Sequence, residues 1–336
     1  MEKEKSAIYI IGSPFQALCA IEAKHYFNCF KNDFFITYLS DEIKKKSTII
    51  NIFNNFGINI YQEIILPKYF NYLKYVITNF FKNTKYDYIF IGDYYNTAYY
   101  LLALTFKKRG SKIIFLDDGN STMEAFSFRF KYAKSRGTAY YLRHLITKTF
   151  CFPLFKNSNT FFTIFSSTET NYFNIIPNNF ELIRANALNK DLSDESIVII
   201  GTNLVEMGLY SKEDYIKLLV NVLKKYPQAH SIYYFPHRGE SEIKLNDIEK
   251  ISNMIIKENN TCIELEIINN SIAPKLIIGF GSTALFSLKM LYLNSVVIGY
   301  SLNMSADYQN VIYAYIWKEY VKKGIKIIDL CKENII

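Results

Sequence analysis

The first half of the chain alternates short apolar runs with longer amphipathic stretches. In the longer stretches apolar residues recur at spacings of three and four, which is the period of a helix buried on one side. The expected strands are Ala7–Ile11, Phe34–Leu39, Tyr88–Ile91 and Ile113–Leu116. The expected helices are Pro14–Phe27, Ile43–Phe56, Tyr69–Phe81 and Asn96–Lys108. This order predicts βα units around a mostly parallel sheet.

The same alternation restarts after a polar stretch at Asn186–Ser196. Here the expected strands are Ile197–Ile200, Ser231–Phe235, Lys275–Ile278 and Val296–Ile298. The expected helices are Lys212–Tyr226, Asn246–Glu258 and Thr283–Leu293, with Ala306–Lys322 as a final helix that crosses back. A chain of 336 residues exceeds what one core usually organises. We therefore expect an α/β protein of the GT-B type, with Rossmann-like domains at 1–190 and 191–336 and a site in the cleft facing both sheets.

Composition narrows the classes of partner. The net charge of +8 favours anionic partners such as nucleotide phosphates, anionic glycans or an acidic membrane leaflet. The basic residues are scattered and no DNA-binding or RNA-binding signature is present, so no nucleic acid partner is expected.

The cysteines and the apolar runs indicate a cellular location. Five cysteines form no CxxC pair, which argues against a zinc cage and a disulfide framework and favours reduced thiols. No uninterrupted apolar run reaches the ~18 residues of a membrane span. We expect a soluble cytoplasmic protein, at most peripheral on the cytoplasmic face of an inner membrane.

Two turns of the first half carry candidate chemistry. Gly12, Ser13 and Gln16 follow the first strand, where free backbone N–H groups at a helix start can hold an anion or sugar hydroxyls. This is no GxGxxG fingerprint, so dinucleotide binding is not indicated, and a purely structural turn is the alternative. The second turn is Asp117-Asp118-Gly119-Asn120, in which one carboxylate can act as a general base while the other orients the loop. An ordinary Asp-Gly turn is the alternative.

Three turns of the second half also carry candidate chemistry. Pro236-His237-Arg238 ends a strand with a proton donor beside a fixed charge, which suits a phosphate leaving group. Gly281-Ser282-Thr283 opens a helix with N–H and O–H donors that can hold a phosphate without a metal, or can simply cap the helix. The turn Gly201-Thr202-Asn203 leads to Glu206, which is an alternative base or a solvated loop residue.

Together these motifs resemble the bacterial sialyltransferases of glycosyltransferase family 52 and the related bacterial polysialyltransferases of family 38. Asp117-Asp118-Gly119, His237 and Ser282-Thr283 match their acidic turn, His-Pro motif and later hydroxyl pair in order and spacing. The segment Ser13–Gln16 with Ala20–Ala23 also resembles their first strand and helix, so the similarity spans roughly the whole chain. One departure is that His237 follows Pro236 and precedes Arg238, so the His-Pro order is absent.

The resemblance implies an inverting, metal-independent transfer of sialic acid, or a related nonulosonic acid, from a CMP-activated donor to a surface glycan such as lipooligosaccharide or capsule. It implies that Asp118 takes the acceptor's proton, that His237 assists CMP departure and that Ser282 and Thr283 hold the phosphate. Glu206 stays open as the base. The expected donor-binding residues are Gly201, Thr202, Asn203, Pro236, Arg238, Gly281, Ser282 and Thr283. The expected acceptor-binding residues are Gly12, Ser13, Gln16, Asp117, Gly119 and Asn120.

Other activities remain open at this point. The donor could be another sugar nucleotide or CMP-Kdo, or the chain could be a non-catalytic nucleotide-binding protein of glycan assembly. No metal or cofactor besides the CMP-sugar donor is expected, and a homodimer is left open.

Overall fold

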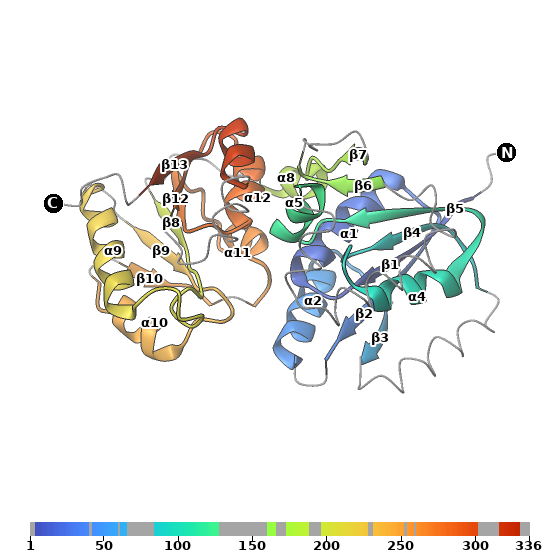
Figure 1. The fold of residues 1–336 in the computed structure, drawn as a ribbon, viewed down its shortest axis with the longest axis horizontal. Coiled ribbons are helices and arrows are strands. Elements are labelled where there is room, and N and C mark those ends of the chain that lie inside the picture. The colour runs from blue at the N-terminus through green and yellow to red at the C-terminus, as the bar shows by residue number, and fades with distance from the viewer. Residues whose placement is uncertain are drawn as a thin grey trace. The chain divides into compact units, whose positions relative to one another are not determined.

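The chain divides into two compact units, Met1–Leu182 and Ile183–Ile336, in the computed structural model. The structure describes residues 4–39, 42–59, 61–65, 84–127, 160–165, 173–187, 196–227, 231–251, 254–258, 260–301 and 316–329. Each unit is built around one parallel sheet, as Figure 1 shows. The expected domain boundary at 190 stays a prediction, because residues 188–195 lie outside the described part.

The first unit holds a seven-stranded sheet in the order β3-β2-β1-β4-β5-β6-β7. Every neighbouring pair runs parallel. The strands are β1 (Ser6–Ile11), β2 (Lys31–Tyr38), β3 (Gln62–Ile65), β4 (Tyr86–Ile91), β5 (Lys107–Leu116), β6 (Thr160–Thr163) and β7 (Asn174–Pro177). The helices are α1 (Pro14–Phe27), α2 (Ile43–Asn55), α4 (Thr97–Phe106) and α5 (Asn120–Ser127). Helix α8 (Glu181–Ala187) begins in the first unit and continues into the second. The strand order reverses between β1 and β4, which is where open parallel sheets bind ligands.

The second unit repeats this plan with a six-stranded sheet in the order β10-β9-β8-β11-β12-β13. All of its neighbouring strands are parallel as well. The strands are β8 (Ile197–Ile200), β9 (Ile232–Phe235), β10 (Met254–Ile256), β11 (Leu276–Gly279), β12 (Val296–Ser301) and β13 (Lys326–Asp329). The helices are α9 (Lys212–Lys224), α10 (Glu242–Glu249), α11 (Ile263–Asn269) and α12 (Ala284–Leu291). The order reverses between β8 and β11.

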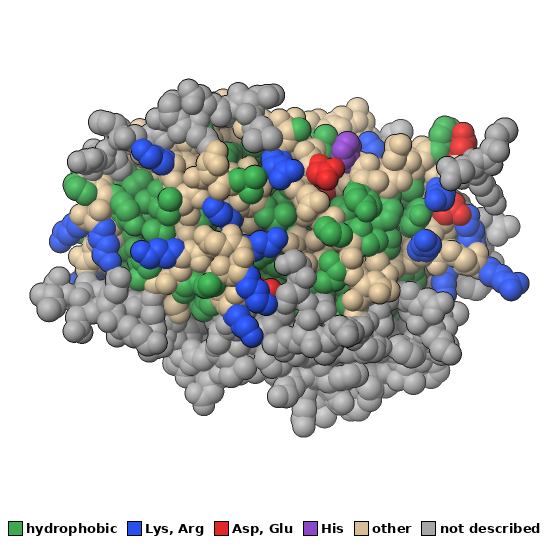
Figure 2. Space-filling view, turned by 90° about the horizontal axis from the view of Figure 1, so that it is seen from above, with side chains coloured by type: hydrophobic (Ala, Val, Ile, Leu, Met, Phe, Trp, Pro, Cys, Tyr) green, Lys and Arg blue, Asp and Glu red, His purple; other side chains and the backbone are tan. Residues whose placement is uncertain are grey.

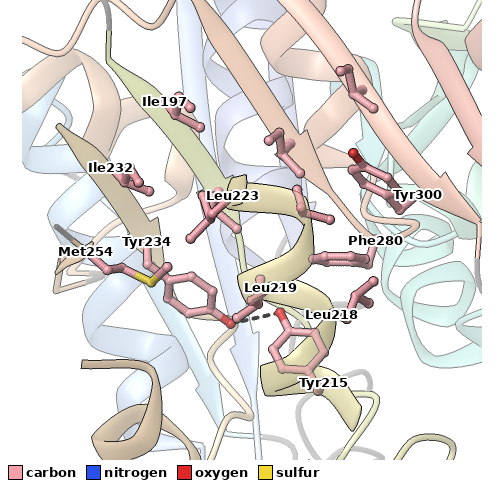
Figure 3. Close-up of a cluster of buried hydrophobic side chains, with 14 of the residues drawn as sticks. Ile197, Tyr215, Leu218, Leu219, Leu223, Ile232, Tyr234, Met254, Phe280 and Tyr300 are labelled. Atoms are coloured by element: carbon pink, nitrogen blue, oxygen red, sulfur yellow. Dashed lines mark hydrogen bonds between the residues drawn. The ribbon is translucent and has the colours of Figure 1, made fainter. Parts of the chain in front are cut away.

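The core of the second unit explains why α9 is a helix in this place. Its apolar residues recur at helical spacing, and Tyr215, Leu219 and Leu223 lie buried against β8 and β9. The Ser211 hydroxyl caps the helix by accepting a hydrogen bond from the Asp214 backbone N–H. Figure 3 shows the Tyr215 ring pointing towards Tyr234 of β9, and their hydroxyls are 3.0 Å apart in a hydrogen bond.

The two-sheet α/β architecture predicted from the sequence is confirmed, but one predicted helix is wrong. Asn246–Glu258 was expected to be helical, whereas α10 ends at Glu249 and Met254–Ile256 forms strand β10 beside β9. The three consecutive apolar residues of β10 extend the sheet by one edge strand, which local helical spacing does not reveal. The predicted helix Tyr69–Phe81 lies outside the described residues, as does most of Ala306–Lys322, of which residues 316–322 are helical.

Basic side chains are spread over the surface, and the described cysteines are buried. In Figure 2, Lys and Arg side chains are interspersed with apolar and uncharged ones rather than gathered into one patch. Cys19, Cys29 and Cys262 are buried, and Cys151 and Cys331 lie outside the described part. Within the described ranges, no helix is both long enough and apolar enough to cross a bilayer.

Candidate functional site

The first group of candidate residues meets at the carboxyl ends of β1 and β5. The Gln16 amide accepts a hydrogen bond from the Gly12 backbone N–H at 2.7 Å and donates one to the Asp118 carboxylate at 2.6 Å. The Ser13 hydroxyl lies 3.5 Å from the same carboxylate oxygen and accepts a bond from the Gln16 N–H, which caps α1. The structure therefore brings together Gly12, Ser13, Gln16 and Asp118, which we call the Asp118 half-site.

Three residues that sequence reasoning missed shape this half-site. A side chain at Gly12 would collide with the hydroxyls of Tyr99 and Thr37, which hydrogen-bond each other at 2.5 Å. A side chain at Gly92, just after β4, would collide with the Gln16 amide. The only signal for Gly92 was its place after a predicted strand. The close packing at both glycines fixes the amide that orients Asp118.

The two neighbouring aspartates have different environments. Asp117 is fully buried, and its carboxylate accepts a hydrogen bond from the Ile164 N–H at 2.7 Å. Burial raises the pKa of Asp117 to about 7, although hydrogen bonds from Thr163, Ile164 and Thr122 oppose the rise. Asp118 is only partly buried. Asp117 thus ties the turn to β6, and Asp118 is the carboxylate that a ligand can approach.

Asp117 gives a stability prediction with a definite sign. Its folded pKa of about 7 lies above that of an unfolded aspartate, so the unfolded chain loses the proton first as pH rises. Its contribution to the free energy of unfolding should therefore fall between pH ~4 and ~7, by up to ~4 kcal/mol. Asp117→Asn keeps an acceptor for the Ile164 N–H and does not titrate. Relative to wild type, this variant should gain stability over that range, as measured by urea unfolding at several pH values.

Asp247→Asn is the matched control for this experiment. Hydrogen bonds from Lys212 and Lys250 lower the pKa of Asp247 to about 2, so this carboxyl stays ionised throughout the range tested. Its variant should run parallel to wild type above pH ~4.5. Parallel curves for Asp117→Asn as well would contradict a buried, titrating Asp117.

The remaining acceptor candidates lie in the same turn. Gly119 has φ 63°, a left-handed conformation that favours glycine, and its carbonyl accepts a bond from the Thr122 N–H. The Thr122 hydroxyl accepts the Asp118 N–H at 2.8 Å, which closes the turn into α5. Asn120 is the first residue of α5 and is partly buried. The turn conformation therefore presents Asp118 at the end of β5.

The second group of candidates surrounds His237 at the end of β9. The Gly239 N–H donates to His237 Nδ1 at 3.1 Å, so this nitrogen is an acceptor and the neutral ring carries its proton on Nε2. Burial lowers the pKa of His237, and the positive charges of Arg238 and Lys244 lower it further, against Glu206. Near neutral pH the ring is therefore an uncharged N–H donor. Arg238 itself is exposed, and Pro236 is partly buried.

Glu206 lies beside this turn, and its contacts stabilise the charged form of its carboxylate. It accepts hydrogen bonds from the Ser241 N–H at 2.9 Å and the Ser241 hydroxyl at 3.1 Å, and it lies 3.7 Å from the Lys244 ammonium. Partial burial raises the pKa of Glu206, but these contacts outweigh burial and hold it below its usual value. A carboxylate stabilised in its charged form is a weak base.

The turn after β8 lies close to the His237 backbone. A side chain at Gly201 would collide with Glu240, Tyr234 and the His237 backbone nitrogen. Thr202 is buried, and its carbonyl accepts a hydrogen bond from Lys244 at 2.5 Å. Asn203 lies against Gly239. We call Gly201–Asn203, Glu206 and Pro236–Glu240 the His237 half-site.

The last candidate turn joins β11 to α12. Gly281 has φ 77°, and the Ser282 hydroxyl accepts a bond from the Ala284 N–H at 3.3 Å. The Ser282 carbonyl accepts the Tyr320 hydroxyl at 3.1 Å. Thr283 precedes α12 without capping it through its side chain. Ser282 and Thr283 are both partly buried at the start of this helix, where N–H groups favour an anion.

Glu240 and Lys244 are further charged residues that sequence reasoning missed. Both side chains are 0% exposed, and they lie 3.7 Å apart. Glu240 stands three residues after His237, and this spacing was the only available signal. Within the described ranges, no group of three or more His, Cys, Asp or Glu side chains could hold a metal ion.

No protein-family model and no curated protein matches this chain. Solved structures do. The alpha/beta-galactoside alpha-2,3-sialyltransferase of Photobacterium phosphoreum is 14% identical, with a TM-score of 0.57 over 97% of this chain and 99% of that one. The UDP-GlcNAc 2-epimerase of Neisseria meningitidis, solved with UDP-GlcNAc, is 12% identical, with a TM-score of 0.56 over 96% and 95%.

A third solved structure is also similar to this chain. A Glycyrrhiza uralensis protein complexed with glycyrrhetinic acid 3-O-monoglucuronide is 9% identical, with a TM-score of 0.54 over 97% of this chain and 81% of that one. The chain has a GT-B-like fold. Identities this low show the fold alone, so the activity has to be argued from the two half-sites.

Proposed function

We propose that this GT-B protein transfers a sialic acid, or a related nonulosonic acid, from a CMP-activated donor to a surface glycan. The observation that carries the proposal is the environment of Asp118. This carboxylate lies in the turn after β5, is partly exposed and is oriented by Gln16 and Ser13, as a general base for an acceptor hydroxyl requires. The sialyltransferase of Photobacterium phosphoreum shares this fold nearly end to end, so the fold is compatible with such a transfer.

In the proposed reaction, Asp118 accepts the proton of the acceptor hydroxyl while that oxygen bonds to the anomeric carbon of the donor sugar. The bond from this carbon to the phosphate oxygen breaks with inversion, and its electron pair leaves with CMP. His237 donates a hydrogen bond from Nε2 to the departing phosphate, and Arg238 supplies positive charge. The turn at Gly281, Ser282 and Thr283 holds the same phosphate by N–H and O–H donors.

A second candidate is a sugar-nucleotide epimerase. The fold match to the Neisseria meningitidis enzyme, named for UDP-GlcNAc, is as extensive as the match to the sialyltransferase. The two activities differ in the donor base, in the bond that breaks and in the need for an acceptor. They are therefore separable by product analysis.

The deciding experiment incubates purified protein with CMP-sialic acid and a panel of galactosides, with CMP-Kdo and UDP-GlcNAc in parallel. Products are identified by mass spectrometry. A sialylated galactoside together with free CMP is the expected result. An isomerised or hydrolysed UDP-sugar would favour the epimerase, and CMP binding without turnover would favour a non-catalytic nucleotide-binding protein.

The turn between β11 and α12 leads to a prediction about CMP binding. Ser282→Ala combined with Thr283→Ala should weaken CMP binding by ~1–3 kcal/mol, because hydrogen bonds to a charged phosphate contribute in that range. Titration calorimetry with CMP measures the difference. Ser211→Ala is the control, since it removes a hydroxyl that caps α9 in the same unit. Unchanged CMP affinity in the folded double variant would reduce this turn to helix capping.

The location and the wider partners also stay predictions. The net charge of +8 favours a peripheral contact with the anionic cytoplasmic face of an inner membrane. Co-sedimentation with anionic vesicles would test this contact, and light scattering would test a homodimer.

A further inference from the structure

A buried ammonium group lies directly behind His237. Lys244 on α10 is 0% exposed, which is rare for lysine unless the charge is paired. Its Nζ donates to the Thr202 carbonyl at 2.5 Å and lies 3.7 Å from each of the carboxylates of Glu206 and Glu240. It also lies 4.1 Å from the centre of the Tyr215 ring, within the range of a cation–π contact.

Glu240 connects this ammonium to the histidine turn. Its carboxylate accepts the His237 backbone N–H at 3.2 Å and the Tyr234 hydroxyl at 2.9 Å. Tyr234 in turn shares a hydrogen bond with Tyr215 of α9, as Figure 3 shows. We call Tyr215, Tyr234, Glu240 and Lys244 the Lys244 network.

The network joins four separate pieces of the second unit. Lys244 contributes from α10 and Tyr215 from α9, while Tyr234 belongs to β9 and Glu240 to the turn that follows it. Through the Thr202 carbonyl it also reaches the turn after β8. The absent side chain at Gly201 leaves the space through which Glu240 approaches the His237 N–H. The position of the histidine turn is therefore defined by these buried polar contacts.

Stability alone is a weak reason for such an arrangement. Desolvation of two buried charges commonly cancels their attraction, and apolar replacements of such pairs are often neutral or stabilising. Here Lys244 also contacts the turn after β8, and Glu240 contacts the His237 backbone N–H. We propose that Lys244 and Glu240 are positioning residues that hold the His237 ring against the departing phosphate. This inference rests on the proposed function.

The charges around the ring also affect the pKa of His237. The groups that face His237 are Arg238 and Glu240 from its own turn, Lys244 from α10 and Glu206 from the turn after β8. Burial lowers the pKa of His237, and Arg238 and Lys244 lower it further, while Glu206 opposes them. Removing the ammonium should therefore raise the pKa of His237. A role confined to packing would leave this pKa where it is.

The test is a histidine NMR titration of Lys244→Met beside wild type, with the His237 resonance assigned from its loss in His237→Ala. The pKa of His237 should rise in Lys244→Met. The kcat for transfer should fall about 10²-fold with little change in the donor KM, because misplacing a reacting group by ~1 Å costs that much. Lys250→Met is the matched control, since Lys250 lies exposed directly after the same helix, and it should change neither quantity.

Lys244→Met leaves Glu240 without its cation and can fail to fold. The double variant Lys244→Met with Glu240→Gln leaves no unpaired charge between the two and serves in that case. A folded variant with an unchanged His237 titration and a kcat within about twofold of wild type would overturn the proposal. The titration does not depend on turnover. A raised pKa in a protein without transfer activity would therefore count against the proposed function and not against the placement of Lys244.

Discussion

Asp118→Asn should lower kcat by ~10²–10⁴ and leave CMP affinity nearly unchanged, which is the signature of a lost general base. Asparagine keeps the shape of the side chain and can still accept the hydrogen bond that Gln16 donates to Asp118 at 2.6 Å. It cannot accept a proton from the acceptor hydroxyl. The measurement is steady-state transfer to a galactoside, with CMP calorimetry on the same preparations.

Glu206→Gln is the matched control, because it makes the same chemical change in the second unit. The hydrogen bonds from Ser241 and the nearby Lys244 hold the pKa of Glu206 below its usual value, so its loss should cost much less activity. A nearly inactive Glu206→Gln beside a nearly normal Asp118→Asn would move the base to the second unit. Asp118 would then only shape the acceptor turn.

Much of the fold was predictable because strand and helix periods are local properties of the chain. The buried strands β1, β8 and β11 read as short apolar runs, and Ser13 with Pro14 marked the start of α1. Edge strands such as β7 and β10 were missed. They are three or four residues long and are stabilised by a neighbouring strand, which is a tertiary effect.

The candidate site was predictable where chemistry follows a strand directly. Asp118, His237 and Ser282 each stand in a turn after a predicted strand, and the structure places them at the carboxyl ends of β5, β9 and β11. The different environments of Asp117 and Asp118 were harder to assign. Alternation along an extended chain indicates that the two side chains diverge, but only the contact with Ile164 shows which of them is buried.

The supporting residues could not be inferred from the sequence. Lys244 lies on a helix whose other charged residues are exposed or partly exposed, so the expected place for its ammonium was the surface. Its ammonium is buried against Tyr215 and Thr202, which lie 29 and 42 residues earlier in the sequence. Such contacts arise when α10 packs against the turns after β8 and β9, and no local sequence pattern predicts them.

His237→Ala should lower turnover by ~10²–10⁴ without loss of the fold, because the variant removes the N–H donor proposed for the departing phosphate. The ring accepts a hydrogen bond from the Gly239 N–H of its own turn, so its loss removes a contact within that turn. His25→Ala is the control, since His25 is exposed on α1. A folded His237→Ala enzyme that retains more than about half of wild-type activity would end this assignment.

The pH dependence of turnover then separates two ways in which His237 could act. Burial, followed by Arg238 and Lys244, lowers the pKa of His237, so the ring is neutral at pH 7 and above and charges only on acidification. A neutral Nε2–H donor predicts that kcat stays level as pH rises from ~7 to ~8.5, because the donor is already fully formed. An imidazolium acid predicts that kcat falls steadily over the same interval, because less of the charged ring is present. The alkaline side is decisive, since the two forms of the His237 ring predict different slopes there. A level profile in wild type that His237→Ala scales down without changing its shape would support the hydrogen-bonding role, and a falling one would assign proton transfer to the ring.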